Sequence, residues 1–292
     1  MRILAATDFS TRSDRALLRA VLLARVAGAT LTLLHAVDDD RPAYMIASQR
    51  DAAATLLRET TQAIADVDGI TADFAVAAGD AFAAILQAAD EVDADLIVVG
   101  PHRRQLLDMF VGTTAERTIR RSRRPVLMAN AVPAGPYRRS LLALDLDTAS
   151  RAAVMGARRL GLLDQSEAIA LHLFDAPAAG MMKRAMEVPA AIDHYVGAEE
   201  RRAAADFDAF LAEVGPPRPQ RLLRPARGSP AGAILGCAKE RDVDLIVVGT
   251  NQRKGLQRLM LGSVAQDVLV DAPCDVLVVP AADEEDAASA RP

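Results

Sequence analysis

Residues that commonly build metal sites and disulfides are scarce in this chain of 292 residues. It has two cysteines and four histidines, and it has no tryptophan. Cys237 and Cys274 lie far apart without the spacing of a metal site, which predicts two buried thiols in a reducing compartment. His35 and His172 lie within apolar runs, with no carboxylate or cysteine at ligand spacing, so a structural role is favoured over metal binding. The sequence therefore predicts no metal site of the protein's own.

The chain also lacks a long apolar run, a signal-peptide pattern and a strong net charge. No apolar stretch approaches the ~20 residues that a membrane span requires, and the chain runs from Met1 directly into a predicted strand. The formal net charge of -5 gives no overall attraction to nucleic acid or anionic lipid. A local run of arginines without interleaved aromatics is interpreted as a solvated helix face: Arg117, Arg120, Arg121, Arg123 and Arg124. We therefore expect a cytoplasmic protein that binds neither nucleic acid nor membranes.

One six-residue stretch occurs twice and organises the rest of the chain. Residues 95–100 read Asp-Leu-Ile-Val-Val-Gly, and residues 244–249 repeat them letter for letter. A short apolar β-branched run that ends in glycine is typical of a parallel strand buried on both faces. Each copy leads into a basic loop, and the loops close at Gly112-Thr113 and at Gly262-Ser263, before a helix-like segment. Each unit thus presents a strand, a loop and a helix N-terminus, whose free N–H groups suit a phosphate.

The similarity extends over both halves of the chain. Strand-like and helix-like segments alternate throughout, which predicts an α/β fold with a parallel sheet wound on both sides. Asp8 and Asp145 lie 137 positions apart, whereas Gly100 and Gly249 lie 149 apart. The second half therefore holds about twelve extra residues, expected in a helix or helix pair within residues 177–214. We predict two tandem doubly wound domains, residues 1–132 and 137–280, each with a five-stranded parallel sheet in the order 3-2-1-4-5. Residues 281–292 are expected to form a disordered acidic tail.

The predicted strand order creates two candidate sites at the carboxyl ends of the strands. In such a sheet the ligand crevice lies where the winding reverses, so Asp8 should lie beside Gly100, and Asp145 beside Gly249. Each carboxylate could then accept a hydrogen bond from a ribose hydroxyl, and each loop could wrap phosphates. Two plainer interpretations stay open at this point. The glycines could be structural turn residues, and the two aspartates could cap the helices that follow them.

At these residues the chain resembles the universal stress protein family, as two tandem copies that cover nearly all of it. Nucleotide-binding members of that family carry the pattern G-x2-G-x9-G-[ST] after the fourth strand. The segment from Gly249 to Ser263 matches this pattern in length and at its outer positions, but Gln252 replaces the second glycine. In the first half Arg103 stands at that position, and the loop is one residue shorter. A side chain there can obstruct a phosphate, so the second half is the better candidate.

The resemblance implies an adenine nucleotide α-hydrolase-like fold and a stress-response protein that binds ATP or another adenine nucleotide, with Mg2+ accompanying the nucleotide. The implied binding residues of the second half are Asp145, Val248, Gly249, Gln252, Gly262, Ser263 and Val264. Those of the first half are Asp8, Val37, Gly100, Arg103, Gly112 and Thr113. No catalytic residue is predicted, since no nucleophile–base pair is recognisable, although slow ATP hydrolysis stays open. The alternative is a scaffold of the same fold in which neither half binds a nucleotide.

The resemblance also implies how the two halves pair. Single-domain members of the family dimerise, so a fused pair is expected to satisfy the same surface internally, as a pseudo-twofold dimer. The fifth strands, residues 125–129 and 275–279, are apolar, and apolar edge strands in soluble proteins are normally covered. We expect them to form the seam between the halves. Whether two chains form a homodimer, and which protein partner responds to the nucleotide, stays open.

Overall fold

The computed structural model describes residues 1–101, 113–185, 188–216, 218–250 and 262–281. Within them, strands alternate with helices in both halves, as predicted. The first half contains β1 (Arg2–Ala6), α1 (Ser13–Ala27), β2 (Thr30–Val37), α2 (Ala43–Asp68), β3 (Ala72–Ala78), α3 (Ala81–Glu91), β4 (Leu96–Val99), α4 (Thr114–Arg121) and β5 (Val126–Met128). The second half contains β6 (Arg139–Leu144), α5 (Thr148–Arg159), β7 (Glu167–Phe174), α6 (Pro177–Arg184), α7 (Pro189–Val214), β8 (Gln220–Pro225), α8 (Pro230–Glu240), β9 (Leu245–Thr250), α9 (Ser263–Asp271) and β10 (Asp275–Pro280).

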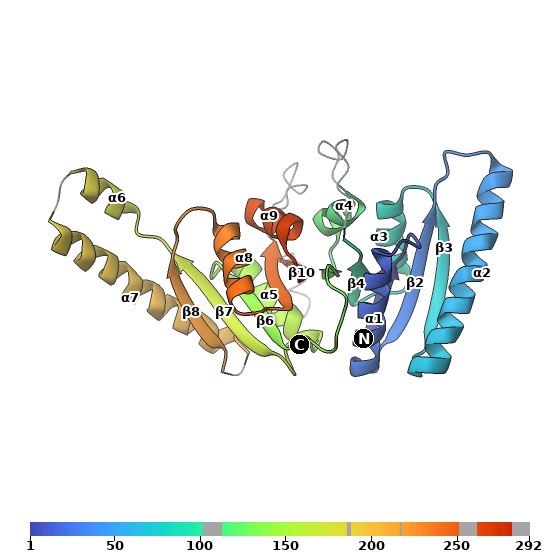
Figure 1. The fold of residues 1–292 in the computed structure, drawn as a ribbon, viewed down its shortest axis with the longest axis horizontal. Helices are drawn as coiled ribbons and strands as arrows, with labels where there is room; N and C mark the ends of the chain where they lie inside the picture. The colour runs from blue at the N-terminus through green and yellow to red at the C-terminus, as the bar shows by residue number, and fades with distance from the viewer. Residues whose placement is uncertain (102–112, 186–187, 217, 251–261, 282–292) are drawn as a thin grey trace, which may run out of the picture.

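These strands form one continuous sheet in the order β3-β2-β1-β4-β5-β10-β9-β6-β7-β8, which Figure 1 shows from the side. Each half contributes five adjacent strands in the predicted order 3-2-1-4-5, and neighbouring strands within a half are parallel. Apolar side chains of α1, α2, α5 and α7 pack on one face of the sheet, and those of α3, α4, α8 and α9 pack on the other. The predicted doubly wound α/β fold is therefore confirmed.

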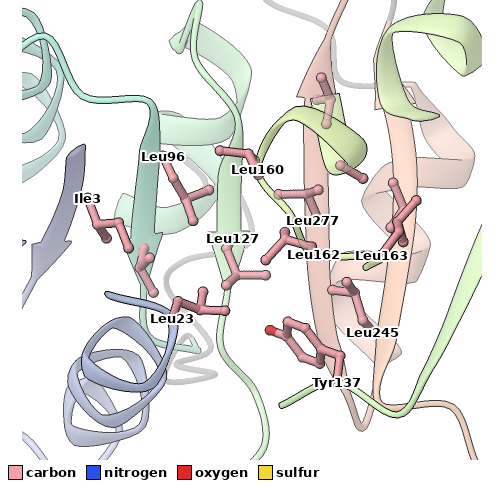
Figure 2. Packing of buried hydrophobic residues seen from close by; sticks show 14 of the residues in the cluster. Ile3, Leu23, Leu96, Leu127, Tyr137, Leu160, Leu162, Leu163, Leu245 and Leu277 are labelled. Atoms are coloured by element: carbon pink, nitrogen blue, oxygen red, sulfur yellow. The ribbon is translucent and has the colours of Figure 1, made fainter. Parts of the chain in front are cut away.

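The seam between the halves is formed by the two fifth strands. β5 pairs antiparallel with β10, with Leu127 opposite Leu277 in the register, and both side chains are fully buried. Figure 2 shows these two leucines in one cluster with Leu96 of the first half and Leu160 of the second. The pairing covers the apolar edge that each half would otherwise expose, and it confirms the expected seam.

A buried charged cluster holds the segment that links the halves, and no local sequence pattern predicts it. Arg19 of α1 donates through Nε to the Asp275 carboxylate of β10 at 2.8 Å, and the Tyr137 hydroxyl donates to the same oxygen at 2.8 Å. The other oxygen of Asp275 accepts from the Ala131 amide at 3.0 Å. The side chain of Arg19 is 4% exposed and that of Asp275 is 0% exposed. Burial and the negative charge of Asp275 raise the pKa of Tyr137 well above its ordinary value.

The structure also bears on smaller predictions about the second-half insertion, the cysteines and the C-terminal residues. The segment predicted to hold the extra residues folds as a helix pair, α6 and α7, and α7 ends one residue before Gly215. Both cysteines are buried, as predicted, and burial raises the pKa of the Cys274 thiol to about 12. No helix among the described residues is long and apolar enough to cross a membrane. Of the predicted tail, residues 282–292 lie outside the described part of the chain.

Candidate functional site

The larger candidate site lies at the carboxyl ends of β6 and β9, where the winding of the second half reverses. The two strands are adjacent and parallel, so Asp145, after β6, and Gly249, within β9, open into the same cavity. Its volume is about 570 Å³. The predicted residues on its wall are Asp145, Val248, Gly249, Gly262, Ser263 and Val264. Apolar side chains from β7 and α8 complete the wall: Leu171, Leu173, Pro230 and Ile234.

The N-terminus of α9 faces this cavity without a side-chain cap. Gly262 is the N-cap residue, and its carbonyl accepts the first helical hydrogen bond from Gln266, at 3.0 Å. A Cβ atom added at Gly262 would meet no atom of the described residues within 4 Å, and its φ of −57° is accessible to every amino acid. The described part of the fold therefore does not require glycine at this position. No described side chain caps the first amides of α9, at Ser263 and Val264, which suit an acceptor in the cavity.

The fold requires glycine at position 249 for a steric reason that is independent of any ligand. A Cβ added there would lie 2.1 Å from the carbonyl oxygen of Ala149, because the first turn of α5 crosses directly over the end of β9. In the first half, a Cβ at Gly100 would lie 2.9 Å from the carbonyl oxygen of Arg12. Both glycines thus have a structural role, which comes from the close approach of the next helix start rather than from a turn.

The two aspartates do not cap the helices that follow them, so that interpretation is wrong. Asp147 is the cap of α5 and accepts from the Ser150 amide at 2.8 Å, whereas Asp145 is exposed and binds Ser150 Oγ only through its own amide. In the first half Asp8 is likewise exposed, and its carboxylate accepts from the Ser10 amide at 3.0 Å, ahead of α1. Both carboxylates therefore stand at the cavity walls without a helix-capping role.

The equivalent cavity of the first half is smaller, at about 350 Å³. The structure brings the predicted residues Asp8, Gly100 and Thr113 together on its wall. Burial opposes the charged form of Asp8, but hydrogen bonds with Ser10 and Ser13 outweigh it and lower the pKa of this carboxyl group. Unlike α9, α4 is capped, because Thr113 Oγ1 accepts from the Glu116 amide at 3.1 Å.

Of the predicted residues, Val37 lies away from the cavity lining, and three others fall outside the described part of the chain. Val37 is buried and is absent from the lining of the first cavity, to which its neighbour Ala36 contributes instead. Successive side chains of a strand point to opposite faces, so Val37 faces the side covered by α1 and α2. Arg103, Gly112 and Gln252 lie outside the residues that the structure describes.

The comparison with known proteins is decisive for the family. The sequence model of the universal stress protein family matches this chain twice, over residues 1–130 and 136–280. The chain belongs to the universal stress protein family. Two curated relatives are universal stress proteins of Methanocaldococcus jannaschii, 50% identical over 52 residues, and of Thermus aquaticus, 44% identical over 82 residues. These matches cover 18% and 28% of this chain and span only 31% and 55% of the two relatives.

Solved structures of two universal stress proteins share the fold over nearly the whole chain. The one from Archaeoglobus fulgidus has a TM-score of 0.69 at 20% identity, covering 96% of this chain and 98% of its own. The putative one from Pseudomonas aeruginosa has a TM-score of 0.62 at 23% identity, covering 96% of this chain and 92% of its own. At these identities the likeness shows the fold of the tandem universal stress protein, and nothing about its ligands.

The sequence prediction missed three residues of this universal stress protein that shape its first cavity. Arg12 and Arg117 line the cavity, and Arg117 donates to the carboxylate of Asp80, the N-cap residue of α3, at 2.8 Å. The sequence signal for Arg117 is the arginine run, whose composition predicts a solvated face. The two strand histidines have a structural role. His35 Nδ1 lies 2.9 Å from the Thr7 carbonyl oxygen, and His172 Nδ1 lies 2.9 Å from the Leu144 carbonyl oxygen.

Proposed function

We propose that this universal stress protein binds an adenine nucleotide, ATP or ADP, in the cavity of its second half and acts through conformation or partner contacts. The observation that carries the proposal is Gly262. It leaves open space at the uncapped N-terminus of α9, although the backbone there would accept any residue. Free helix N-terminal amides and their positive dipole end are a suitable environment for phosphate oxygens.

The remaining parts of a nucleotide match the other walls of this cavity. The exposed carboxylate of Asp145 can accept from ribose hydroxyls. The apolar side chains from β7 and α8, among them Leu171 and Ile234, offer a surface for the base. Carboxylate oxygens are ligands that Mg2+ accepts, so Asp145 and Asp147 fit an ion that arrives with the phosphates. The proposal requires no turnover, and a phosphate-release assay with ATP tests for slow hydrolysis.

Substitutions at Gly262 test the proposal with little risk to folding. Aspartate and asparagine are both good N-cap residues, and their Cβ atom would meet no described atom within 4 Å at this position. Calorimetric titration with ATP, ADP and AMP should show binding to the parent, a weaker signal in Gly262→Asn, and loss of binding in Gly262→Asp, because only aspartate repels the phosphates. Gly180→Asp is the control, since Gly180 is exposed on α6 and also has open space. Equal binding by Gly262→Asp and Gly180→Asp would contradict the proposal.

One observation favours the second candidate, a scaffold that binds no nucleotide. Gly100 and Gly249, the most conspicuous glycines of the repeat, are already explained by the close approach of α1 and α5. The scaffold alternative predicts no heat of binding at millimolar ATP, ADP or AMP. Mass spectrometry of the protein as purified separates the two candidates independently, since a nucleotide carried through purification supports only the first.

A further inference from the structure

The two cavities differ most in their charged residues. The amide of Asp8 binds Ser13 Oγ in the first half, and the amide of Asp145 binds Ser150 Oγ in the second, so these residues are equivalent. This match places Arg12 opposite Ala149. Ala115 and Ala265 line the two cavities at equivalent positions, and two residues further on Arg117 is matched by Asp267. The first cavity therefore has two cations where the second has none at the matching positions.

Arg12 is available to a ligand of the first cavity. It lies at the N-terminus of α1, is partly buried on the cavity wall, and forms no ion pair with any described residue. The charged carboxylate of Asp8 stands on the same wall. The lining of one small cavity thus includes a cationic residue that suits an anionic group and a carboxylate that suits hydroxyl groups, as expected for a small polar ligand.

Arg117 narrows the same cavity from the side of α3. Its guanidinium reaches from α4 to Asp80, at 2.8 Å, and stacks over the ring of Phe82, at 3.7 Å. The second half cannot form this bridge, because the equivalents of Asp80 and Phe82 are Ser229 and Ala231. The bridge lies beside α3, which forms one wall of the first cavity. In the second cavity α8 forms the equivalent wall, and its side chains offer the apolar surface for a base. The first cavity, which Arg117 lines, has a volume of about 350 Å³, and the second has about 570 Å³.

We propose that the first cavity binds a compact phosphorylated sugar that carries no nucleobase, with Arg12 holding the phosphate and Asp8 accepting from the sugar hydroxyls. The Arg117–Asp80 bridge occupies the side on which a base would lie. This proposal concerns the other half of the protein. It takes the base side of the crevice from the proposed function, but its test does not require nucleotide binding in the second cavity.

Ribose 5-phosphate and AMP are a matched pair of probes, since they differ only by the base. Both are titrated calorimetrically into the full chain carrying Gly262→Asp, in which the second cavity bears an added carboxylate. We expect ribose 5-phosphate to bind once per chain and more tightly than AMP and inorganic phosphate. Arg12→Gln should weaken its binding by about tenfold or more, because a charge-assisted hydrogen bond is lost. Arg123→Gln, at an exposed arginine of the same half, should leave the affinity unchanged.

A second variant keeps the proposal falsifiable if Arg12→Gln folds poorly. Arg117→Asp introduces the residue type of the second half, removes the bridge, and should raise the affinity for AMP relative to ribose 5-phosphate. The proposal is overturned if AMP binds the first cavity as tightly as ribose 5-phosphate, if Arg12→Gln behaves like Arg123→Gln, or if inorganic phosphate binds equally well. A parent chain that binds no ATP would contradict only the nucleotide proposal, so the two failures are distinguishable.

Discussion

The two halves of the chain share a strand order, but they carry very different residues at one equivalent position of their first helices. Arg19 of α1 corresponds to Gly156 of α5, by the same match that pairs Ser13 with Ser150. A Cβ at Gly156 would lie 2.8 Å from Val279, so α5 sits tightly on β10, whereas Arg19 reaches across the seam to Asp275. The duplicated frame therefore tolerates different helix packing in its two copies. The seam itself is asymmetric.

The cavities have diverged in the same way. The first is smaller, its α4 is capped by Thr113, and an arginine bridge crosses one side. The second is larger, its α9 is uncapped, and Gly262 leaves room at the helix N-terminus. Duplication thus supplied two copies of one crevice, and the side chains around them have given each copy a different shape and charge.

The largest expected effect is at the asymmetric seam. Arg19→Met leaves the fully buried Asp275 carboxylate without its cation and should lower the free energy of unfolding by about 3–5 kcal/mol. Arg25→Met on the same helix removes only an exposed ion pair with Asp68 and should cost about 0–1 kcal/mol. Denaturant titration of both variants measures the difference. Equal stabilities would mean that the buried cluster does not hold the halves together.

The two strand-end glycines should differ in their tolerance of a methyl group. Gly249→Ala places Cβ 2.1 Å from a backbone oxygen, and Gly100→Ala places Cβ 2.9 Å from one. Gly249→Ala should therefore lower the free energy of unfolding more, by an amount within or above the range of about 1–3 kcal/mol for overpacking. Gly236→Ala in α8 is the control, because it meets no atom within 4 Å and should stabilise by about 0.5–1 kcal/mol. Thermal unfolding of the three variants gives the order. A Gly100→Ala variant less stable than Gly249→Ala would reverse the comparison.

The caps of the two loop-following helices should also differ. Thr113→Ala removes the hydroxyl that caps α4 and should cost about 0.5–2 kcal/mol. The equivalent change in the second half, Ser263→Ala, removes no cap and should stay within about 0.5 kcal/mol of the parent. Urea unfolding measures both values. A loss at Ser263 as large as that at Thr113 would show that α9 is capped in solution.

The smallest expected effect concerns acid stability in the first half. The pKa of Asp8 is lowered in the folded state, so its charged form stabilises the fold above the ordinary value of 3.8, and this contribution is lost as the pH falls through the lower folded-state value. Asp8→Asn should therefore show a flatter decline of stability on acidification below about pH 4. Unfolding free energies measured across that window test it. An unchanged slope would show that the hydrogen bonds with Ser10 and Ser13 do not favour the carboxylate.

Much of the fold was predictable because its determinants are local and repeated. The run Leu245–Val248 is apolar without alternation, which already indicates a strand buried on both faces, and the duplicated aspartates fix the equivalence of the halves. The apolar fifth strands indicated the seam, since an uncovered apolar edge is unfavourable. The placement of Asp145 beside Gly249 followed from the strand order alone.

The features that distinguish the halves were not predictable in the same way. Arg19 and Asp275 are 256 positions apart, and nothing in their local sequence shows that they meet. Arg117 belongs to a run that has the composition of a solvated face, yet its guanidinium closes a cavity wall through Asp80. The resemblance implies that Val37 lines the first cavity, whereas the pleat of β2 turns it to the other face. Such contacts depend on tertiary packing rather than on local pattern.

The stoichiometry of ATP binding to the full chain tests the central difference between the cavities most directly. A calorimetric titration of the parent should give one ATP per chain, because only the second cavity combines an uncapped helix N-terminus with open space at Gly262. Two ATP molecules per chain would contradict the divergence of the cavities. No bound ATP at millimolar concentration would contradict nucleotide binding itself.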